Sequence, residues 1–317
     1  MIRWTESLIL MEELVESMRE GRGGTNRMLN RFRVPVLCMV LGSAALPAGG
    51  LESRTPYHSA SDAVAKPNSE VRLSAWFHHS AGVQKSLEHA PVRAEWLVDG
   101  IWTPLGETTT DEEGKAVLRV QAPPKPGSVK LRWWYKQQPA EGTLFIITQG
   151  QPASVFDIDG TLTLSDSENW KDYGRRLLRD PKPEGPKLRA NAVEAVKRTS
   201  EDSLVVYLTG RPPWLGRPTR EWLAFHHFPE GAVLWMPLTR DILPTQKHVG
   251  EAKLAQLKSL QNSGLAFIRA FGNAPTDIRT YEGAGIPKAR TFIMGKHGGE
   301  GGTVNGGNGY PAKGNLN

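Results

Sequence analysis

The chain has 317 residues, a length that suits about two domains and leaves ample room for a buried core. Hydrophobic residues make up 39 % and charged residues 23 % of the sequence, proportions typical of a folded chain. Lysine and arginine number 39 against 33 acidic residues, a net charge of +6 without blocks of like charge, so nucleic acid is not the expected partner. The single cysteine, Cys38, excludes a disulfide framework and zinc sites built from cysteines.

Residues 28–50 have the pattern of a secretory signal peptide. Basic residues follow Met28, an apolar stretch runs from Val34 to Leu46, and small residues lead to Gly50. The stretch is shorter than the roughly 20 apolar residues of a membrane-spanning helix. We therefore expect residues 1–50 to be an N-terminal extension with a signal peptide, starting at Met1 or Met28, and the remainder to be periplasmic or extracellular. A buried helix or a short membrane anchor is the alternative.

Short strand patterns separated by turns fill residues 70–150. Val71 to Phe77 alternates apolar and polar residues, and Asp99-Gly100 is a strong hairpin turn. Further strand patterns cover 92–98, 101–103, 116–120, 129–135 and 143–148. Because no helical period interrupts them, the segment predicts an immunoglobulin-like β-sandwich, whose partner the sequence does not indicate. The polar residues 51–69 predict a linker before it.

Tryptophans are frequent in this segment and are expected to fill or edge the sandwich core: Trp76, Trp96, Trp102, Trp133 and Trp134. An aromatic face that binds carbohydrate or lipid is the alternative.

Strands alternate with helices from residue 153 to residue 296. Apolar runs typical of buried parallel strands cover 155–158, 204–208, 233–236, 267–271 and 291–294. Helix patterns between them cover 190–198, 219–226 and 250–260. This alternation predicts an α/β domain with a doubly wound parallel sheet. The residues from 297 to 317 are rich in glycine and asparagine, and we expect a disordered tail there.

Three of the five predicted strands end in residues suited to catalysis. Ligands of an open parallel sheet bind at the carboxyl ends of its strands, so we expect these residues to lie together. A lone Asp-x-Asp is weak support, because acidic residues also cap helices and form turns. Three such segments, in order and at strand ends, predict a site: Asp157-Ile-Asp159-Gly160-Thr161, Thr209-Gly210-Arg211 and Gly272-Asn273 with Asp277 beyond it.

The two aspartates of the first segment indicate phosphoryl transfer. Carboxylates as close as Asp157 and Asp159 need a nearby cation, most simply Mg²⁺, whose site Asn273 and Asp277 would complete. Asp277 would act either as a direct ligand or through water. Asp157 is suited to attack phosphorus and form an aspartyl-phosphate, while Asp159 protonates the leaving oxygen and later activates water.

Several further residues are expected to contact the phosphate. Gly160 allows close approach of the backbone, and successive amides at Gly160 and Thr161 form an anion cradle. Thr209 offers a hydroxyl and Gly210 an amide. A lysine should balance the charge, and we favour Lys253 over Lys247. Arg211 either touches the substrate or braces its loop.

Together these motifs resemble the haloacid dehalogenase superfamily. A narrower similarity, to the lipin-type domain, rests on residues 156–163, 207–212, 222–229, 272–281 and 285–287. That domain occurs in Mg²⁺-dependent phosphatidate phosphatases and at the C-terminus of retinal-degeneration-B-type phosphatidylinositol transfer proteins. The resemblance implies that Asp157 is the nucleophile, Asp159 the acid and base, and Thr209 and Lys253 phosphate contacts. It also implies that Asp157, the Asp159 carbonyl and Asn273 hold Mg²⁺.

The same resemblance implies a phosphatase with little cap, open to a large or membrane-held substrate. In the transfer proteins a serine replaces the residue corresponding to Asn273, and these members are thought to bind phosphatidate without hydrolysing it. The asparagine of this chain favours catalysis. We therefore expect a Mg²⁺-dependent phosphatase of phosphatidate or a related lipid phosphate at a membrane surface. The alternatives are a phosphatase of soluble phosphomonoesters and a non-catalytic phosphatidate sensor.

Overall fold

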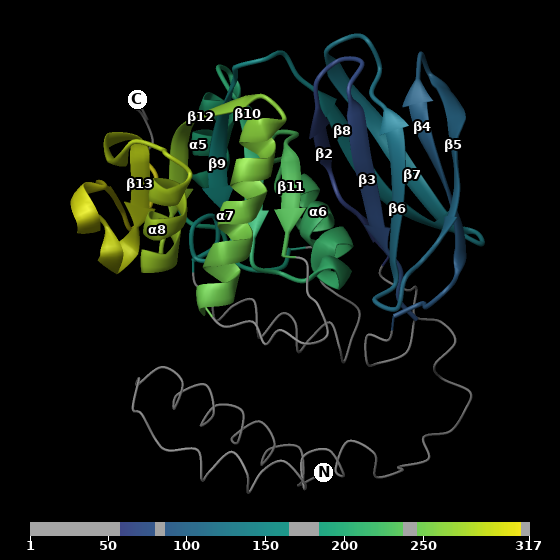
Figure 1. Cartoon of the computed structure of the whole chain (residues 1–317). Helices are drawn as coiled ribbons and strands as arrows, with labels where there is room; N and C mark the ends of the chain where they lie inside the picture. The colour runs from purple at the N-terminus through teal and green to yellow at the C-terminus, as the bar shows by residue number, and fades with distance from the viewer. Residues whose placement is uncertain (1–57, 80–85, 165–183, 237–245, 312–317) are drawn as a thin grey trace, which may run out of the picture. The chain divides into compact units, whose positions relative to one another are not determined.

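The computed structural model describes residues 58–79, 86–164, 184–236 and 246–311 (Figure 1). The predicted signal peptide and both candidate start residues lie outside these ranges. Among the helices within them, none is both long enough and apolar enough to pass through a bilayer.

The N-terminal part is a sandwich of two sheets, as the strand pattern predicted. Its neighbouring strands are antiparallel except for the parallel pair β2 and β8. Trp133 and Phe77 are buried in the core between the sheets, whereas Trp96, Trp102 and Trp134 are half-buried. The smaller sheet has the order β1 (Ser59–Ala60), β3 (Glu70–Trp76), β6 (Lys115–Gln121), and the larger one β2 (Ala63–Ala65), β8 (Gln138–Ile146), β7 (Gly127–Tyr135), β4 (Pro91–Val98), β5 (Ile101–Thr109).

The predicted hairpin turn at Asp99-Gly100 is present in the structure. Both residues have positive φ, 51° and 78°, as a two-residue turn between twisted strands requires. The turn joins β4 to β5 with Val98 opposite Ile101.

The segment predicted to be a linker differs from the prediction. Residues 59–60 pair with β3 as strand β1, and residues 63–65 pair with β8 as strand β2. Strands of two and three residues are too short to show an alternating pattern in the sequence. They can be recognised only from the strands with which they pair. Within the described residues the sandwich therefore starts at Ser59, and residues 51–57 of the predicted linker lie outside them.

The C-terminal part is an α/β domain with a six-stranded sheet in which all neighbouring strands are parallel. The strand order reverses between β9 and β12, which places the ligand-binding crevice of such a sheet at their carboxyl ends. The order is β11 (Ala232–Trp235), β10 (Leu204–Thr209), β9 (Gln151–Asp157), β12 (Leu265–Gly272), β13 (Thr291–Met294), β14 (Val304–Gly307).

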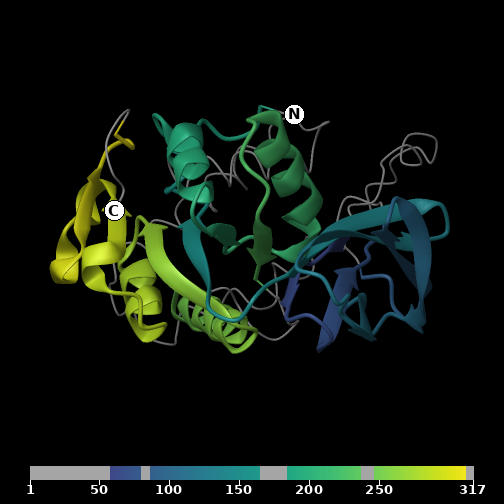
Figure 2. The same cartoon turned by 90° about the horizontal axis from the view of Figure 1, so that it is seen from above.

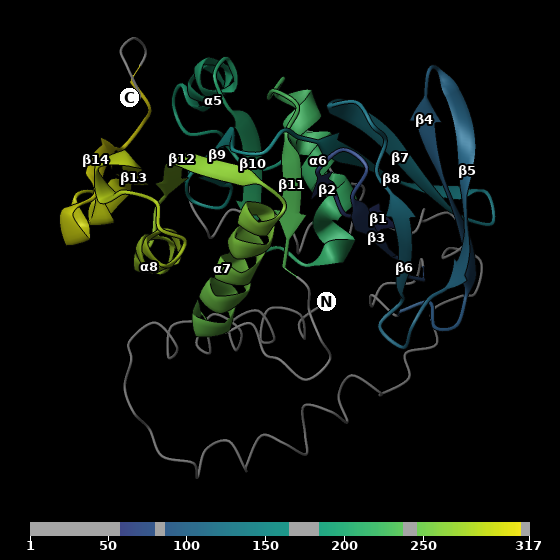
Figure 3. The same cartoon turned by 45° about the horizontal axis from the view of Figure 1, so that its top comes forward.

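Helices cover both faces of this sheet, which confirms the doubly wound arrangement (Figures 2 and 3). Helices α5 (Ala192–Ser200) and α6 (Gly216–Phe225) lie on one face, where Phe156 and Tyr207 are buried. Helices α7 (Gln246–Asn262) and α8 (Pro275–Gly283) lie on the other, over Val155 and Val206. Successive strand residues thus point to opposite apolar layers, which explains why the strands have continuous apolar sequences.

Residues 297–311, predicted to be part of a disordered tail, also differ from the prediction. They include strand β14 at the edge of the sheet and the buried Tyr310. Glycine dominates here because several residues have positive φ, including Gly299 and Gly307, and not because the chain lacks structure.

Asp62 joins the sandwich to the α/β domain. Its carboxylate accepts two hydrogen bonds from the Arg220 guanidinium of α6, at 2.8 and 2.9 Å. It also accepts hydrogen bonds from one backbone amide of each part, that of Thr143 in β8 at 2.6 Å and that of Val233 in β11 at 2.7 Å. Because the carboxylate is buried, these donors replace the water that it would otherwise bind.

We expect Asp62→Asn to destabilise the protein strongly. The change keeps the size of the side chain but leaves Arg220 without its counter-charge and turns an NH₂ group toward a donor. Removing one partner of a buried ion pair costs about 3–5 kcal/mol. Urea denaturation would measure the loss, with Glu221→Gln of the exposed pair with Arg217 as a control expected to cost less than about 1 kcal/mol. A loss from Asp62→Asn as small as that of the control would contradict this role.

His58 should make the sandwich sensitive to acid. The side chain is buried, its Nε2 lies 3.1 Å from Gln138 Oε1, and its Nδ1 accepts the backbone amide of His78 at 3.3 Å. Nδ1 is therefore unprotonated in the folded state. Burial lowers the pKa of His58 from 6.5 to about 4.

The unfolded chain binds the extra proton between these two pKa values, so His58 contributes stability above pH 6.5 that is lost as the pH falls toward 4. We expect this residue to lower the free energy of unfolding by about 2 kcal/mol between pH 7 and pH 5. Urea denaturation at both pH values would show it as a steeper pH dependence in the wild type than in His58→Phe. Equal slopes in the two proteins would rule it out.

Candidate active site

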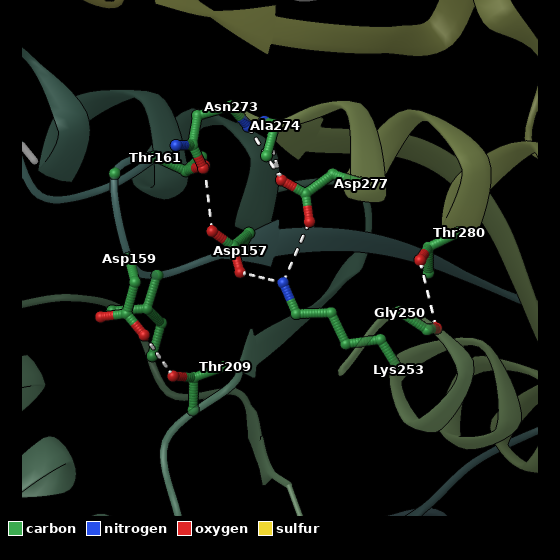
Figure 4. A network of polar contacts seen from close by, with 12 residues as sticks. Asp157, Asp159, Thr161, Thr209, Gly250, Lys253, Asn273, Ala274, Asp277 and Thr280 are labelled. Atoms are coloured by element: carbon green, nitrogen blue, oxygen red, sulfur yellow. Dashed lines mark hydrogen bonds and ion pairs between the residues drawn. The ribbon is translucent and has the colours of Figure 1, made fainter. Parts of the chain in front are cut away.

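The predicted site residues converge at the carboxyl edge of the parallel sheet, where the strand order reverses (Figure 4). Asp157 is the last residue of β9, Thr209 the last of β10, and Asn273 follows the last residue of β12. Lys253 reaches the same point from α7 and Asp277 from the first turn of α8. The topology thus brings together residues that lie up to 120 positions apart in the chain.

Lys253 forms ion pairs with two aspartates. Its Nζ lies 2.6 Å from Asp157 Oδ1 and 3.0 Å from Asp277 Oδ1, and all three side chains are buried. Burial raises the pKa of the Asp157 carboxyl well above its usual range, and the Lys253 ammonium acts in the opposite direction. Burial alone would lower the pKa of Lys253, but the two carboxylates outweigh it and raise that pKa. The Lys253 ammonium therefore opposes the effect of burial and favours the ionised form of Asp157, the form that a nucleophile needs.

Asp277, predicted to bind the metal directly or through water, contacts Lys253 and the start of α8 in this structure. Its Oδ1 is bound to Lys253, and its Oδ2 accepts the backbone amides of Asn273 at 3.0 Å and Ala274 at 3.1 Å. A Cβ on Gly272 would come within 2.6 Å of the Asp277 side chain, so glycine is needed for this approach. Both carboxylate oxygens are thus engaged in holding Lys253 and the start of α8.

Asp159 is held by the loop that follows β10. Thr209 Oγ1 donates to its Oδ2 at 2.6 Å, and Arg211 donates to its Oδ1 from Nε at 3.0 Å and Nη2 at 2.8 Å. Arg211 Nη1 also donates to Thr219 Oγ1 at 3.0 Å. In this structure Arg211 and Thr209 both contact Asp159, and the contact of either residue with a substrate stays a prediction.

The loop after β9 folds back on itself. Gly160 has φ of 80°, and its amide donates to Thr163 Oγ1 at 2.9 Å, so this amide does not face the site as the predicted anion cradle requires. Thr161 Oγ1 lies 3.2 Å from Asp157 Oδ2. Gly210 follows Thr209, and a Cβ on it would lie 3.4 Å from the Val249 side chain of α7. Thr163, to which the sequence analysis gave no role, therefore stabilises the loop.

The residues around the Asn273 amide fit a magnesium ion. One side-chain amide atom lies 3.0 Å from the Asp159 carbonyl oxygen, 3.3 Å from Asp157 Oδ2 and 3.0 Å from Thr161 Oγ1. With Nδ2 turned inward, the amide donates to these oxygens. With Oδ1 turned inward, the site becomes a cluster of oxygens in which only the threonine hydroxyl carries a proton, and a hard cation with oxygen ligands would balance that cluster.

This donor set is a carboxylate, a main-chain carbonyl and an amide. Within the described ranges, no three side chains of histidine, cysteine, aspartate or glutamate gather in an arrangement that could hold a metal. The metal assignment therefore depends on the carbonyl and the amide, and Mg²⁺ stays a prediction.

Comparison with known proteins identifies the domain type. Residues 154–295 match the family model described as "PITM 1-3, LNS2 domain", so this segment is LNS2-like. The chain is 30 % identical over 206 residues to the rat membrane-associated phosphatidylinositol transfer protein 1, covering 63 % of this chain and 15 % of that protein. It is 28 % identical over 250 residues to the Drosophila melanogaster protein retinal degeneration B, covering 76 % of this chain and 18 % of that protein. The chain thus spans less than a fifth of the length of these relatives.

Comparison with solved structures adds little. The Lin-41 filamin domain aligns with 19 % identity and a TM-score of 0.23, covering 29 % of this chain and 94 % of that domain. A TM-score this low carries no argument about function.

Proposed function

We propose that residues 153–296 form a Mg²⁺-dependent phosphomonoesterase that acts through an aspartyl-phosphate on Asp157. The observation that carries the proposal is the pairing of Asp157 with Lys253 beside Asp159 and the Asn273 amide. A buried carboxylate paired with a lysine at a strand end, with a second carboxylate two residues away, supplies the two groups that this chemistry needs.

In the first step a carboxylate oxygen of Asp157 attacks phosphorus while the bond from phosphorus to the leaving oxygen breaks, and Asp159 gives that oxygen a proton. In the second step Asp159 takes a proton from water, whose oxygen attacks phosphorus and releases inorganic phosphate and Asp157. Lys253 balances the charge that Asp157 and the phosphoryl group share. Mg²⁺, held by Asp157, the Asp159 carbonyl and Asn273, would supply positive charge to the phosphate oxygens.

In this structure Asp159 is a hydrogen-bond acceptor for its neighbours. Its two oxygens accept hydrogen bonds from Thr209 and Arg211. We infer that Arg211 releases Asp159 when substrate binds, because the phosphate dianion is a suitable new partner for the guanidinium.

We favour phosphatidate or a related lipid phosphate as the substrate. The support is the similarity to the lipin-type domain and to membrane-associated phosphatidylinositol transfer proteins. The net charge of +6 is compatible with an anionic membrane. We further propose that the mature chain is exported and works at a membrane surface, because residues 28–50 have the pattern of a signal peptide.

A non-catalytic phosphatidate sensor is the second candidate. The ion pair between Arg211 and Asp159 favours a sensor, because it engages the carboxylate that would act as the acid. The rat relative is named as a phosphatidylinositol transfer protein, which also favours a sensor.

Phosphate release from the purified chain separates the candidates. We expect Mg²⁺-dependent release that EDTA abolishes, faster from vesicles with dioleoyl phosphatidate than from a panel of soluble phosphomonoesters. Faster release from a soluble compound would replace the lipid substrate but keep the reaction. If no compound releases phosphate and the chain still co-sediments with phosphatidate vesicles, the sensor is correct.

A further inference from the structure

The C-terminal residues 304–311 lie against the loop that carries Asp157 and Asp159. This segment contains β14 and Tyr310 and follows the part of the chain that matches the LNS2 model, which ends at residue 295 (Figure 3). It contacts the loop through Arg189, which lies just before α5, and through the Tyr310 hydroxyl.

Arg189 binds two consecutive carbonyl groups of the loop. Its Nε donates to the Thr161 carbonyl at 3.1 Å, and its Nη2 donates to the Gly160 carbonyl. Its Nη1 donates to the Asn308 carbonyl of the C-terminal segment at 2.9 Å. The side chain is more than nine-tenths buried, so these carbonyls replace water around the guanidinium.

Tyr310 anchors the C-terminal segment in the same place. Its amide donates to the Ala190 carbonyl at 3.0 Å, and its own carbonyl accepts Asn191 Nδ2 at 2.8 Å. Its ring is buried, with its centroid 6.1 Å from that of Phe271, two residues before Asn273. Its hydroxyl lies 3.4 Å from the Thr161 carbonyl oxygen.

The loop needs such external donors because it is a single turn. The amides of Leu162 and Thr163 both bond to the Ile158 carbonyl, at 2.9 and 3.1 Å. The carbonyls of Gly160 and Thr161, which come at the end of this turn, point away from it and bond to Arg189. Because each peptide unit is planar, fixing a carbonyl also fixes the direction of the next amide. Arg189 therefore sets the orientation of the peptide units that follow Asp159.

We propose that Arg189, held by the C-terminal segment, is a positioning residue for residues 157–163, and that this segment is part of the catalytic unit. The link to turnover rests on the proposed phosphatase function. The link to loop order does not, because it depends only on the contacts of Arg189 and Tyr310.

Two variants and one control test the proposal in the full chain. Arg189→Lys keeps the charge but cannot bond to three carbonyls with one ammonium in the same geometry. Tyr310→Ala leaves Arg189 in place and removes the anchor of the segment. The control, Arg119→Lys, makes the same substitution at an exposed arginine of β6 in the sandwich, where Arg119 pairs with Glu70.

Hydrogen exchange on peptides covering residues 156–164 measures loop order, and release of phosphate from p-nitrophenyl phosphate and phosphatidate vesicles measures turnover. We expect Arg189→Lys to raise exchange in the loop at least tenfold and to lower kcat by about 10- to 100-fold with a smaller change in KM. Tyr310→Ala should also raise exchange in the loop and lower kcat, each by a smaller factor than Arg189→Lys does. Arg119→Lys should match the wild type.

Unchanged loop exchange in Arg189→Lys would overturn the proposal, as would an equal rise over the whole α/β domain, which is the mark of simple destabilisation. If Arg189→Lys does not fold, Tyr310→Ala decides by the same local comparison. If the wild type releases no phosphate, the proposed function fails, and the exchange data still decide whether Arg189 orders the loop.

Discussion

Asp157→Asn is expected to lower phosphate release from phosphatidate by about three orders of magnitude or more, because an amide cannot form the covalent intermediate. Asparagine has nearly the size of aspartate, and its Oδ1 can still accept from Lys253 Nζ, which lies 2.6 Å from the native oxygen. The loss should therefore appear in kcat rather than in folding. Initial rates at saturating Mg²⁺ and a thermal melt of the same sample would measure both.

Asp99→Asn is the matched control for this change. It makes the same chemical substitution in the exposed hairpin turn of the sandwich, where Asn-Gly is as favourable as Asp-Gly. We expect wild-type rates from it.

Vesicle binding by Asp157→Asn distinguishes enzyme from sensor. One negative charge facing the phosphate disappears, so co-sedimentation with phosphatidate vesicles should persist or increase. A wild-type rate no higher than that of Asp157→Asn, with vesicle binding intact in both, would show that the domain binds phosphatidate without hydrolysing it.

The placement of the candidate site followed from the sequence because topology determines it. Parallel strands end at one edge of their sheet, so residues directly after β9, β10 and β12 had to meet, wherever the intervening helices ran. Lys253 was predicted for a related reason, since it lies on the helix between β11 and β12, and a helix that connects parallel strands runs back from their carboxyl edge.

The partners of each side chain were less predictable than its position. Residue types suggested that Thr209 contacts phosphate, yet its hydroxyl faces Asp159. Whether Asp277 binds a metal or caps α8 depends on the turn at Gly272, which brings the backbone amides to its carboxylate. Such choices depend on distances of a few tenths of an ångström, which a sequence pattern does not contain.

Arg189 and the C-terminal segment could not be found from residue types at all. Arg189 bonds to main-chain carbonyls, which every residue has, so the sequence around Gly160 and Asn308 gives no sign of a partner. The glycine-rich composition of residues 297–311 suggested disorder, whereas the positive φ of glycines such as Gly299 is what lets this segment turn back toward the sheet.

The second large effect is expected from Lys253→Met. Methionine has a similar length and fills the same buried space, but the carboxylates of Asp157 and Asp277 then share one site without a cation between them. Like charges at this distance favour protonation of one of them, and burial raises the pKa of Asp157 further. A protonated Asp157 is a poor nucleophile, so we expect kcat to fall by about 10²- to 10³-fold.

The same substitution should lower the free energy of unfolding by about 3–5 kcal/mol, because it removes the shared partner of two buried charges. Rates must therefore be measured at a temperature where thermal melts show Lys253→Met to be folded. Lys258→Met, an exposed position on the same helix, is the matched control and should retain wild-type rates and stability. If folded Lys253→Met releases phosphate within threefold of the wild type, Lys253 does not keep Asp157 ionised, and the assignment of Asp157 as the nucleophile loses its electrostatic basis.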